Sequence, residues 1–137
     1  MVDETGLNIK MADIRAEIPL VIGEKEYEMI ELLRKTNLSR PIAFTLACLV
    51  KGGEVSSQSI EMVSGLRQPE VSVAMRYLRK NNWIDVREEK KSKGKGRPIK
   101  LYKLTVPIGS IVNKIEQQIL QENQLVLQNI QYLKRIS

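Results

Sequence analysis

The sequence predicts a mainly α-helical protein with a small β-hairpin and a long C-terminal helix. Apolar residues recur every three to four positions over much of the chain, as on the buried face of a helix. Two short runs rich in β-branched and aromatic residues flank a charged, glycine-bearing segment at 88–96, a pattern typical of a hairpin. From Pro107 onward apolar residues repeat with a spacing close to seven, which predicts one long helix.

Length and charge limit the number of domains and the kind of partner. The 137 residues, 42% of them hydrophobic, suffice for one domain with an appendage. The net charge of +6 is unevenly distributed. Residues 67–103 hold 12 Lys/Arg and 4 Asp/Glu, whereas the remaining 100 residues hold 10 and 12. One strongly basic segment in an otherwise slightly acidic chain predicts a polyanionic partner.

The composition argues against several classes of function. The chain has no histidine and one cysteine, Cys48, so neither a zinc site nor a Ser-His or Cys-His nucleophile can be built in the usual way, which leaves carboxylate-only chemistry as the alternative. Cys48 lies in the longest apolar run, 42–50, which is too short to span a membrane and predicts a buried helix. The acidic N-terminus carries no secretory signal. We therefore expect a cytoplasmic protein without enzymatic activity, metal or cofactor.

The N-terminal half is expected to supply the core. Residues 1–23 form an arm, which is either a partner-contacting segment with a short helix or a frayed tail. Helices are predicted over 24–35 and 40–51. The second is apolar nearly all round, so we expect it to be the central buried helix, ended by Gly52-Gly53.

The next stretch predicts two helices joined by a tight turn. A very short strand is expected over 54–56, after which Ser56 or Ser57 can cap a helix. The inward side of this helix is expected to carry Ile60, Met62 and Val63. The turn is Ser64-Gly65-Leu66, and a second helix runs over 68–80. A turn of this length that contains glycine is typical of a helix-turn-helix, and the strands that follow would complete a winged helix over 24–106.

The outward face of the 68–80 helix is unusual for a solvated surface. Its inward stripe is Val71, Ala74, Met75 and Leu78. Its outward residues are small, polar or cationic, and they are the candidate DNA contacts: Gln68, Pro69, Ser72, Val73, Arg76, Tyr77 and Arg79. In such a role Arg76 would pair with guanine and Gln68 with adenine. The alternative is a solvated helix face in a protein-binding domain.

The hairpin is predicted to carry a basic wing. Strands are expected over 83–87 and 99–106, with Trp83 and Tyr102 more plausible as core residues than as base-stacking platforms. The loop over 88–100 holds too many like charges for internal pairing: Lys90, Lys91, Lys93, Lys95, Arg97 and Lys100. Lys95-Gly96-Arg97-Pro98 is similar to the core of minor-groove hooks. The alternative is a solvated tip in which Gly and Pro shape the turn.

The C-terminal segment, 107–137, is predicted to be a dimerisation helix opened by Pro107 or capped by Ser110. With Val112 at heptad position a, the a series is apolar throughout, whereas the d series has Glu122 and Asn129 in the middle. Residues expected at the dimer seam are Val112, Ile115, Ile119, Val126, Ile130 and Leu133. A seam wider than a strict two-stranded zipper fits this pattern better, and packing within one chain is the alternative.

These residues also resemble a known family. Through Gly65 to Leu78, Trp83-Ile84, Gly96-Arg97-Pro98 and Tyr102-Lys103-Leu104, the chain is similar to winged helix-turn-helix transcriptional regulators of the MarR/TrmB/ArsR-like group, archaeal type. The resemblance covers roughly 24–106. It implies that the 68–80 helix enters the major groove, that the wing touches backbone or minor groove, and that terminal helices form the dimer. Metal sensing is not implied, because the Cys and His ligands are missing.

The sequence thus predicts a sequence-specific DNA-binding regulator that acts as a homodimeric repressor on double-stranded DNA. The alternative is a winged-helix interaction module, or a chromatin-associated protein that binds DNA without sequence choice. A small-molecule effector is compatible with the resemblance, but no convergent polar residues indicate a pocket for one.

Overall fold

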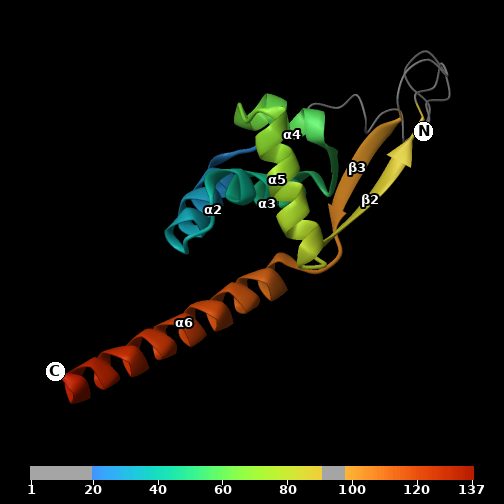
Figure 1. The fold of residues 1–137 in the computed structure, drawn as a ribbon. Helices are drawn as coiled ribbons and strands as arrows, with labels where there is room; N and C mark the ends of the chain where they lie inside the picture. Colours follow the sequence, from blue (N-terminus) through green and yellow to red (C-terminus); the bar gives the residue numbers. More distant parts are fainter. Residues whose placement is uncertain (1–19, 91–97) are drawn as a thin grey trace, which may run out of the picture. The chain divides into compact units, whose positions relative to one another are not determined.

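The computed structural model of the chain describes residues 20–90 and 98–137. Along these residues the elements are α2 (Glu24–Lys35), α3 (Arg40–Gly52), β1 (Glu54–Ser56), α4 (Ser57–Ser64), α5 (Gln68–Lys80), β2 (Ile84–Glu89), β3 (Ile99–Leu104) and α6 (Ile108–Ile136) (Figure 1). The chain divides into two compact units, Met1–Thr105 and Val106–Ser137, which we describe separately. The predicted mainly helical fold with a small sheet is confirmed. No helix among the described residues is long and apolar enough to cross a membrane.

Helix α3 is the centre of the first unit. It contacts α2, α4, α5 and the strands β1 and β3. Every residue from Ile42 to Leu49 is buried, as the nearly uniform apolar sequence predicted. Cys48 lies within this buried run, and burial raises the pKa of its thiol from 9.0 to about 12. Its role is therefore that of a small core residue, because a protonated thiol is a poor nucleophile.

The turn between α4 and α5 is held by hydrogen bonds on both sides. Gly65 has φ +72° in the left-handed region, and its N–H donates to the Glu61 carbonyl at 2.9 Å. The Ser64 hydroxyl donates to the Ile60 carbonyl (2.6 Å) and accepts from the Leu66 N–H (3.1 Å). The Leu66 side chain is buried. These contacts fix the angle at which α5 leaves the turn, and the predicted turn at Ser64-Gly65-Leu66 is confirmed.

Hydrogen bonds also hold the chain where α5 ends. Asn82 adopts φ +59°, which asparagine tolerates better than most residues. The Trp83 N–H donates to the Leu78 carbonyl at 3.0 Å, and the Thr105 N–H donates to the Trp83 carbonyl at 2.8 Å. The indole of Trp83 is buried, so the preferred prediction of a core residue is confirmed. The end of β3 is thereby joined to the end of α5.

The sheet contains three antiparallel strands in the order β1-β3-β2. Register pairs are Glu54 with Lys103 for the outer strand β1 and Ile84 with Leu104 for β2. The predicted hairpin is present, although its strands run over 84–89 and 99–104 instead of 83–87 and 99–106. Arg87 on β2 forms a two-pronged contact with Glu54 on β1, with N–O distances of 2.8 and 2.6 Å. This pair spans the central strand and joins the two edges of the sheet.

Two predicted core residues lie outside the core, because Tyr102 is only half-buried and Met62 is exposed. Met62 was expected on the inward side of the helix after the short strand, but its side chain is 84% exposed. In α4 the buried residues are Ile60 and Ser64, four positions apart and therefore on one face. Met62 lies two positions from Ile60, about 200° round the helix. Val63 is half-buried.

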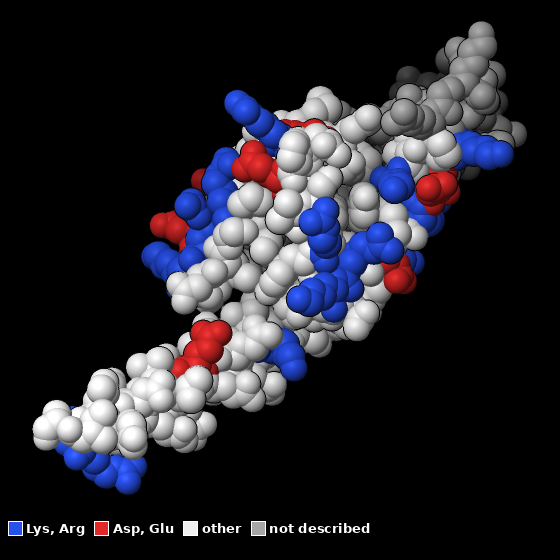
Figure 2. All heavy atoms as spheres, in the orientation of Figure 1, with Lys and Arg blue, Asp and Glu red and all other residues white. Residues whose placement is uncertain are grey.

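The second unit is the single helix α6, preceded by Pro107, so Pro107 and not Ser110 precedes its first turn. Ile111 and Ile115 are buried. On the face shown in Figure 2, most of the surface of this helix carries no charged side chain. Its exposed large apolar side chains are Val112, Leu120, Leu125, Val126, Leu127, Ile130, Tyr132, Leu133 and Ile136.

Candidate nucleic-acid interface

The outward face of α5 is the first component of the candidate interface. The inward stripe predicted for this helix is confirmed, because Val71, Ala74, Met75 and Leu78 are all buried. The exposed face begins with polar residues, where the Gln68 amide nitrogen donates to the Ser72 hydroxyl at 3.1 Å. Further along it turns cationic. The exposed residues of this face are Gln68, Pro69, Ser72, Val73, Arg76, Arg79 and Lys80.

A groove of about 670 Å³ lies between α5 and β3. The residues that line it are Ser72, Met75, Arg76, Arg79, Lys80, Lys100 and Tyr102. Four of the seven are cations, and none is acidic. Figure 2 shows Lys and Arg side chains gathered on the face where α5 and β3 lie. A concave surface lined by one sign of charge concentrates the field and attracts an anion.

These cations are not paired within the described part of the chain. No carboxylate there lies within ion-pair distance of Arg76, Arg79 or Lys100, and the same holds for Lys80. Arg87 provides the contrast, because its guanidinium is held by Glu54 and lies 3.4 Å from Glu89. The hydrogen bond with Glu54 raises the pKa of Arg87. Arg87 thus stabilises the sheet, whereas the four cations of the groove remain available to a ligand.

Not every predicted contact belongs to this face. Tyr77 is half-buried, with its ring edge-on to Trp83 at 6.0 Å, and burial raises its pKa. It therefore supports α5 from the side. Lys90 is exposed at the end of β2 but does not line the groove. The remaining wing predictions, Lys91, Lys93, Lys95 and Arg97, lie outside the described residues, as do residues 1–19 of the predicted arm.

Two lining residues were absent from the predicted contact set, Lys80 and Tyr102. Both could have been found from the sequence. Lys80 follows Arg76 by four positions and so lies on the same helical face. Tyr102 follows Lys100 by two positions in a strand, which places both on one side of the sheet. The buried Leu101 between them fixes which side that is.

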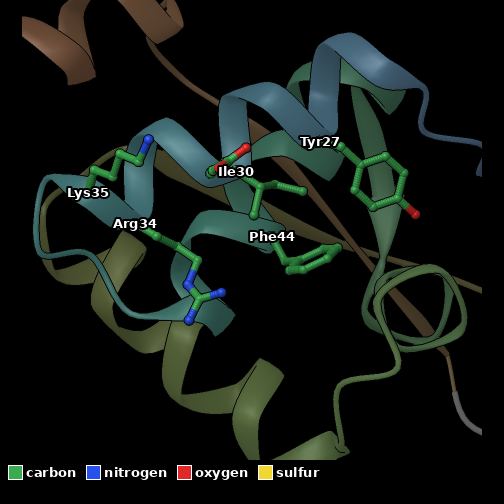
Figure 3. Close-up of a pocket in the computed structure, with 6 residues that line it drawn as sticks. Tyr27, Ile30, Arg34, Lys35 and Phe44 are labelled. Atoms are coloured by element: carbon green, nitrogen blue, oxygen red, sulfur yellow. The ribbon is translucent and has the colours of Figure 1, made fainter.

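A second hollow, of about 380 Å³, is lined by α2 and α3 (Figure 3). The rings of Tyr27 and Phe44 meet edge to face at 6.2 Å along it. Arg34 and Lys35 come from the last turn of α2 and extend in different directions in Figure 3, while Glu31 adds the opposite charge. The polar groups do not converge on one point. Among the described residues, no group of three or more His, Cys, Asp or Glu side chains could hold a metal ion.

Comparison with known proteins identifies a bacterial relative. The chain is 40% identical over 91 residues to the biofilm growth-associated repressor of Agrobacterium fabrum, and the matched region covers 66% of this chain and 75% of that protein. No protein-family model matches the chain. The finer placement in the MarR/TrmB/ArsR-like group, archaeal type, stays a prediction.

Proposed function

We propose that this chain, which belongs to the family of the biofilm growth-associated repressor, is a sequence-specific DNA-binding transcriptional repressor of the cytoplasm. In this proposal α4 and α5 form a helix-turn-helix, α5 enters the major groove, and the basic segment 88–100 lies on the DNA backbone or in the minor groove. The observation that carries the proposal is the groove between α5 and β3, where four exposed cations have no carboxylate partner among residues 20–90 and 98–137 and lie beside an exposed polar helix face. No catalytic role is proposed.

The two ends of α5 would have different tasks. Gln68 and Ser72 are neutral hydrogen-bonding residues near its start, and their mutual hydrogen bond restricts the Gln68 amide. Such groups suit base edges. Arg79 lies near the end of α5 and lines the groove together with Lys100. Two cations side by side suit contacts with phosphates, which carry charge but no base sequence. Arg76 lies between and could pair with guanine, a contact worth about 1–3 kcal/mol of discrimination.

A homodimer through α6 is part of the proposal. No described part of the chain covers the exposed apolar side chains of this helix. Val126, for example, is 54% exposed. Two copies of α5 in one dimer would read half-sites about 34 Å apart, or a multiple of that distance, in a pseudo-palindrome. Val126→Asp should turn the dimer into a monomer in sedimentation velocity. A dimer of unchanged stability in that variant would exclude α6 as the seam.

The test of DNA recognition begins with selection of bound duplexes from a random pool, using the full chain. Fluorescence anisotropy then compares the selected duplex with a scrambled one. We expect tighter binding to the selected duplex. Equal affinity for both would overturn the proposal and favour the interaction module or a protein that binds DNA without sequence choice.

Two variants separate base reading from phosphate contact. Arg76→Ala should reduce the preference for the selected duplex by about 1–3 kcal/mol. Lys100→Ala should weaken binding to both duplexes alike and reduce the salt slope, log Kd against log salt, by about 0.9. Arg135→Ala, in the last turn of α6, is the matched control and should change neither quantity. An unchanged selection profile in Arg76→Ala would show that this residue does not read bases.

A further inference from the structure

Two paired α6 helices can run in the same or in opposite directions, and the residues of this helix indicate which arrangement is favoured. The helix runs without interruption over Ile108–Ile136 (Figure 1), about 44 Å at 1.5 Å per residue. Ile115 is only 5% exposed in a single chain, so its part of the predicted seam is already covered. The apolar side chains left uncovered extend from Val112 to Ile136. A second copy can cover them in a parallel or in an antiparallel arrangement.

A parallel pair would bring like groups together. In a parallel pair in register, each residue of the seam faces its own copy. Glu122 occupies a d position between apolar layers, so two carboxylates would meet in the seam. Like charges held close in an apolar setting are unfavourable, and one of them must take up a proton or leave the seam.

An antiparallel pair removes this conflict. Reversing one helix makes a positions face d positions, so Glu122 faces Val126 and Asn129 faces Ile119 of the second copy. Each polar residue at heptad position d then faces an apolar residue at position a of the second copy, and no two carboxylates meet. The same register places Val112 opposite Ile136 of the second copy, and both of these side chains are exposed in one chain.

The flanking charges agree with this register. Glu116 and Lys134 are 18 positions apart, which is five turns, so they lie on the same flank of the helix. In the antiparallel register, Glu116 and Lys134 of the second copy are offset by two residues. Measured along the helix axis, this offset is about 3 Å. In a parallel pair the same two groups would be about 27 Å apart.

We propose that α6 pairs with α6 of a second copy in antiparallel orientation, with Ile119 opposite Asn129 and Glu116 beside Lys134. This inference rests on the homodimer of the proposed function and adds its direction and register. The helix dipoles oppose one another in such a pair, which is also the favourable arrangement.

Cysteine cross-linking in the full chain tests the direction. A disulfide needs Cα atoms about 4.4–6.8 Å apart. The double variant Ile119→Cys/Asn129→Cys should therefore oxidise to a covalent dimer on a non-reducing gel. Each single variant should not, because identical positions would be about 15 Å apart along the axis. The wild-type chain is the control, since its buried Cys48 should give no cross-link.

The outcomes separate the inference from the proposed function. A covalent dimer from Ile119→Cys alone would show a parallel pair and overturn the inference while leaving the dimer intact. A dimer in sedimentation with no cross-link in any variant would overturn the register. A monomer before oxidation would overturn both the inference and the proposed homodimer. A cross-linked double variant without affinity for any duplex would support the inference and overturn the proposed function.

A charge exchange gives an independent measurement. Glu116→Lys and Lys134→Glu should each weaken the dimer roughly two- to tenfold in sedimentation equilibrium, because each removes two exposed ion pairs per dimer. The double variant Glu116→Lys/Lys134→Glu should restore it. Arg135→Glu makes the same change of charge as Lys134→Glu, but at a position about 100° further round the helix, so it is the matched control. Failure of the double variant to recover any affinity would contradict the proposed pairing.

Discussion

Helices α5 and α6 are both amphipathic, yet one chain covers the apolar stripe of α5 and leaves most of that of α6 exposed. Leu78 on α5 is fully buried, whereas Leu133 on α6 is 59% exposed. Helix α5 lies against α3, α4 and β2, and hydrogen bonds fix the chain at both of its ends. The two helices therefore bury their apolar faces at different levels of organisation, α5 within the monomer and α6, in our proposal, within the dimer.

This difference separates folding from assembly. Side chains on α5 should determine the free energy of unfolding of the first unit. The exposed apolar side chains on α6 should determine the dissociation constant of the proposed dimer and affect the first unit little, whereas Ile111 and Ile115 are already buried in a single chain. Trp83 is the one tryptophan of the chain and lies buried at the exit of α5, so its fluorescence reports the first unit.

The largest effect is expected from truncation of a buried leucine. In the Val126→Asp background, which we expect to be monomeric, Leu78→Ala should lower the free energy of unfolding by about 2–5 kcal/mol, because it leaves a cavity beside α3. Leu133→Ala in the same background should change it by less than about 0.5 kcal/mol, as expected of an exposed site. Urea denaturation followed by Trp83 fluorescence measures both. Equal losses in the two variants would contradict the separation of folding from assembly.

A smaller effect is expected from substitution of two glycines, Gly65 in the turn before α5 and Gly109 in the first turn of α6. Gly65→Ala should cost about 1–2 kcal/mol, because φ of +72° is unfavourable for a residue with a Cβ even though no atom obstructs it. Gly109→Ala, in the first turn of α6, meets no obstruction and no unusual φ. It should stabilise α6 by about 0.4–1 kcal/mol. Trp83 fluorescence measures the first effect, and far-ultraviolet circular dichroism of the helix signal measures the second.

The smallest effect is a dependence on alkaline pH. Burial raises the pKa of Tyr77 above its ordinary value of 10.0, so the fold favours the neutral phenol. The corresponding stability is fully present below pH 10.0 and is lost as the pH rises through the higher pKa of the folded state. Tyr77→Phe should remove this part of the pH dependence, and Tyr132→Phe on α6 should leave it unchanged. Denaturation series at neutral and alkaline pH provide the comparison.

The sequence was most informative where a single residue decides the local backbone. Gly65 predicted the turn. Ser56 and Ser57 were the two candidates for the cap of α4, and the structure has Ser56, whose hydroxyl accepts from the Ser59 N–H at 3.1 Å. Periodicity over 13 residues also identified the buried face of α5. Over the eight residues of α4 the same reasoning misplaced Met62, since two turns give too few positions to define a face.

The candidate site was harder to predict because it combines distant segments. The groove joins Arg76 and Arg79 on α5 to Lys100 on β3, and only the pairing of β3 with its neighbours places these cations together. The sequence placed them all in one basic segment but could not distinguish them from Arg87. That distinction depends on Glu54, which lies 33 residues away in the chain and reaches Arg87 across the sheet.

Cys48 offers a practical consequence of the buried central helix. Its thiol is inaccessible and its pKa is about 12, so a thiol-specific reagent at neutral pH can modify it only when the core opens. With excess reagent, the modification rate divided by that of an unfolded reference gives the equilibrium constant for opening when reclosure is fast. The lone cysteine is thus a built-in reporter of native-state fluctuations, against which the rigidity of the DNA-free and DNA-bound protein can be compared.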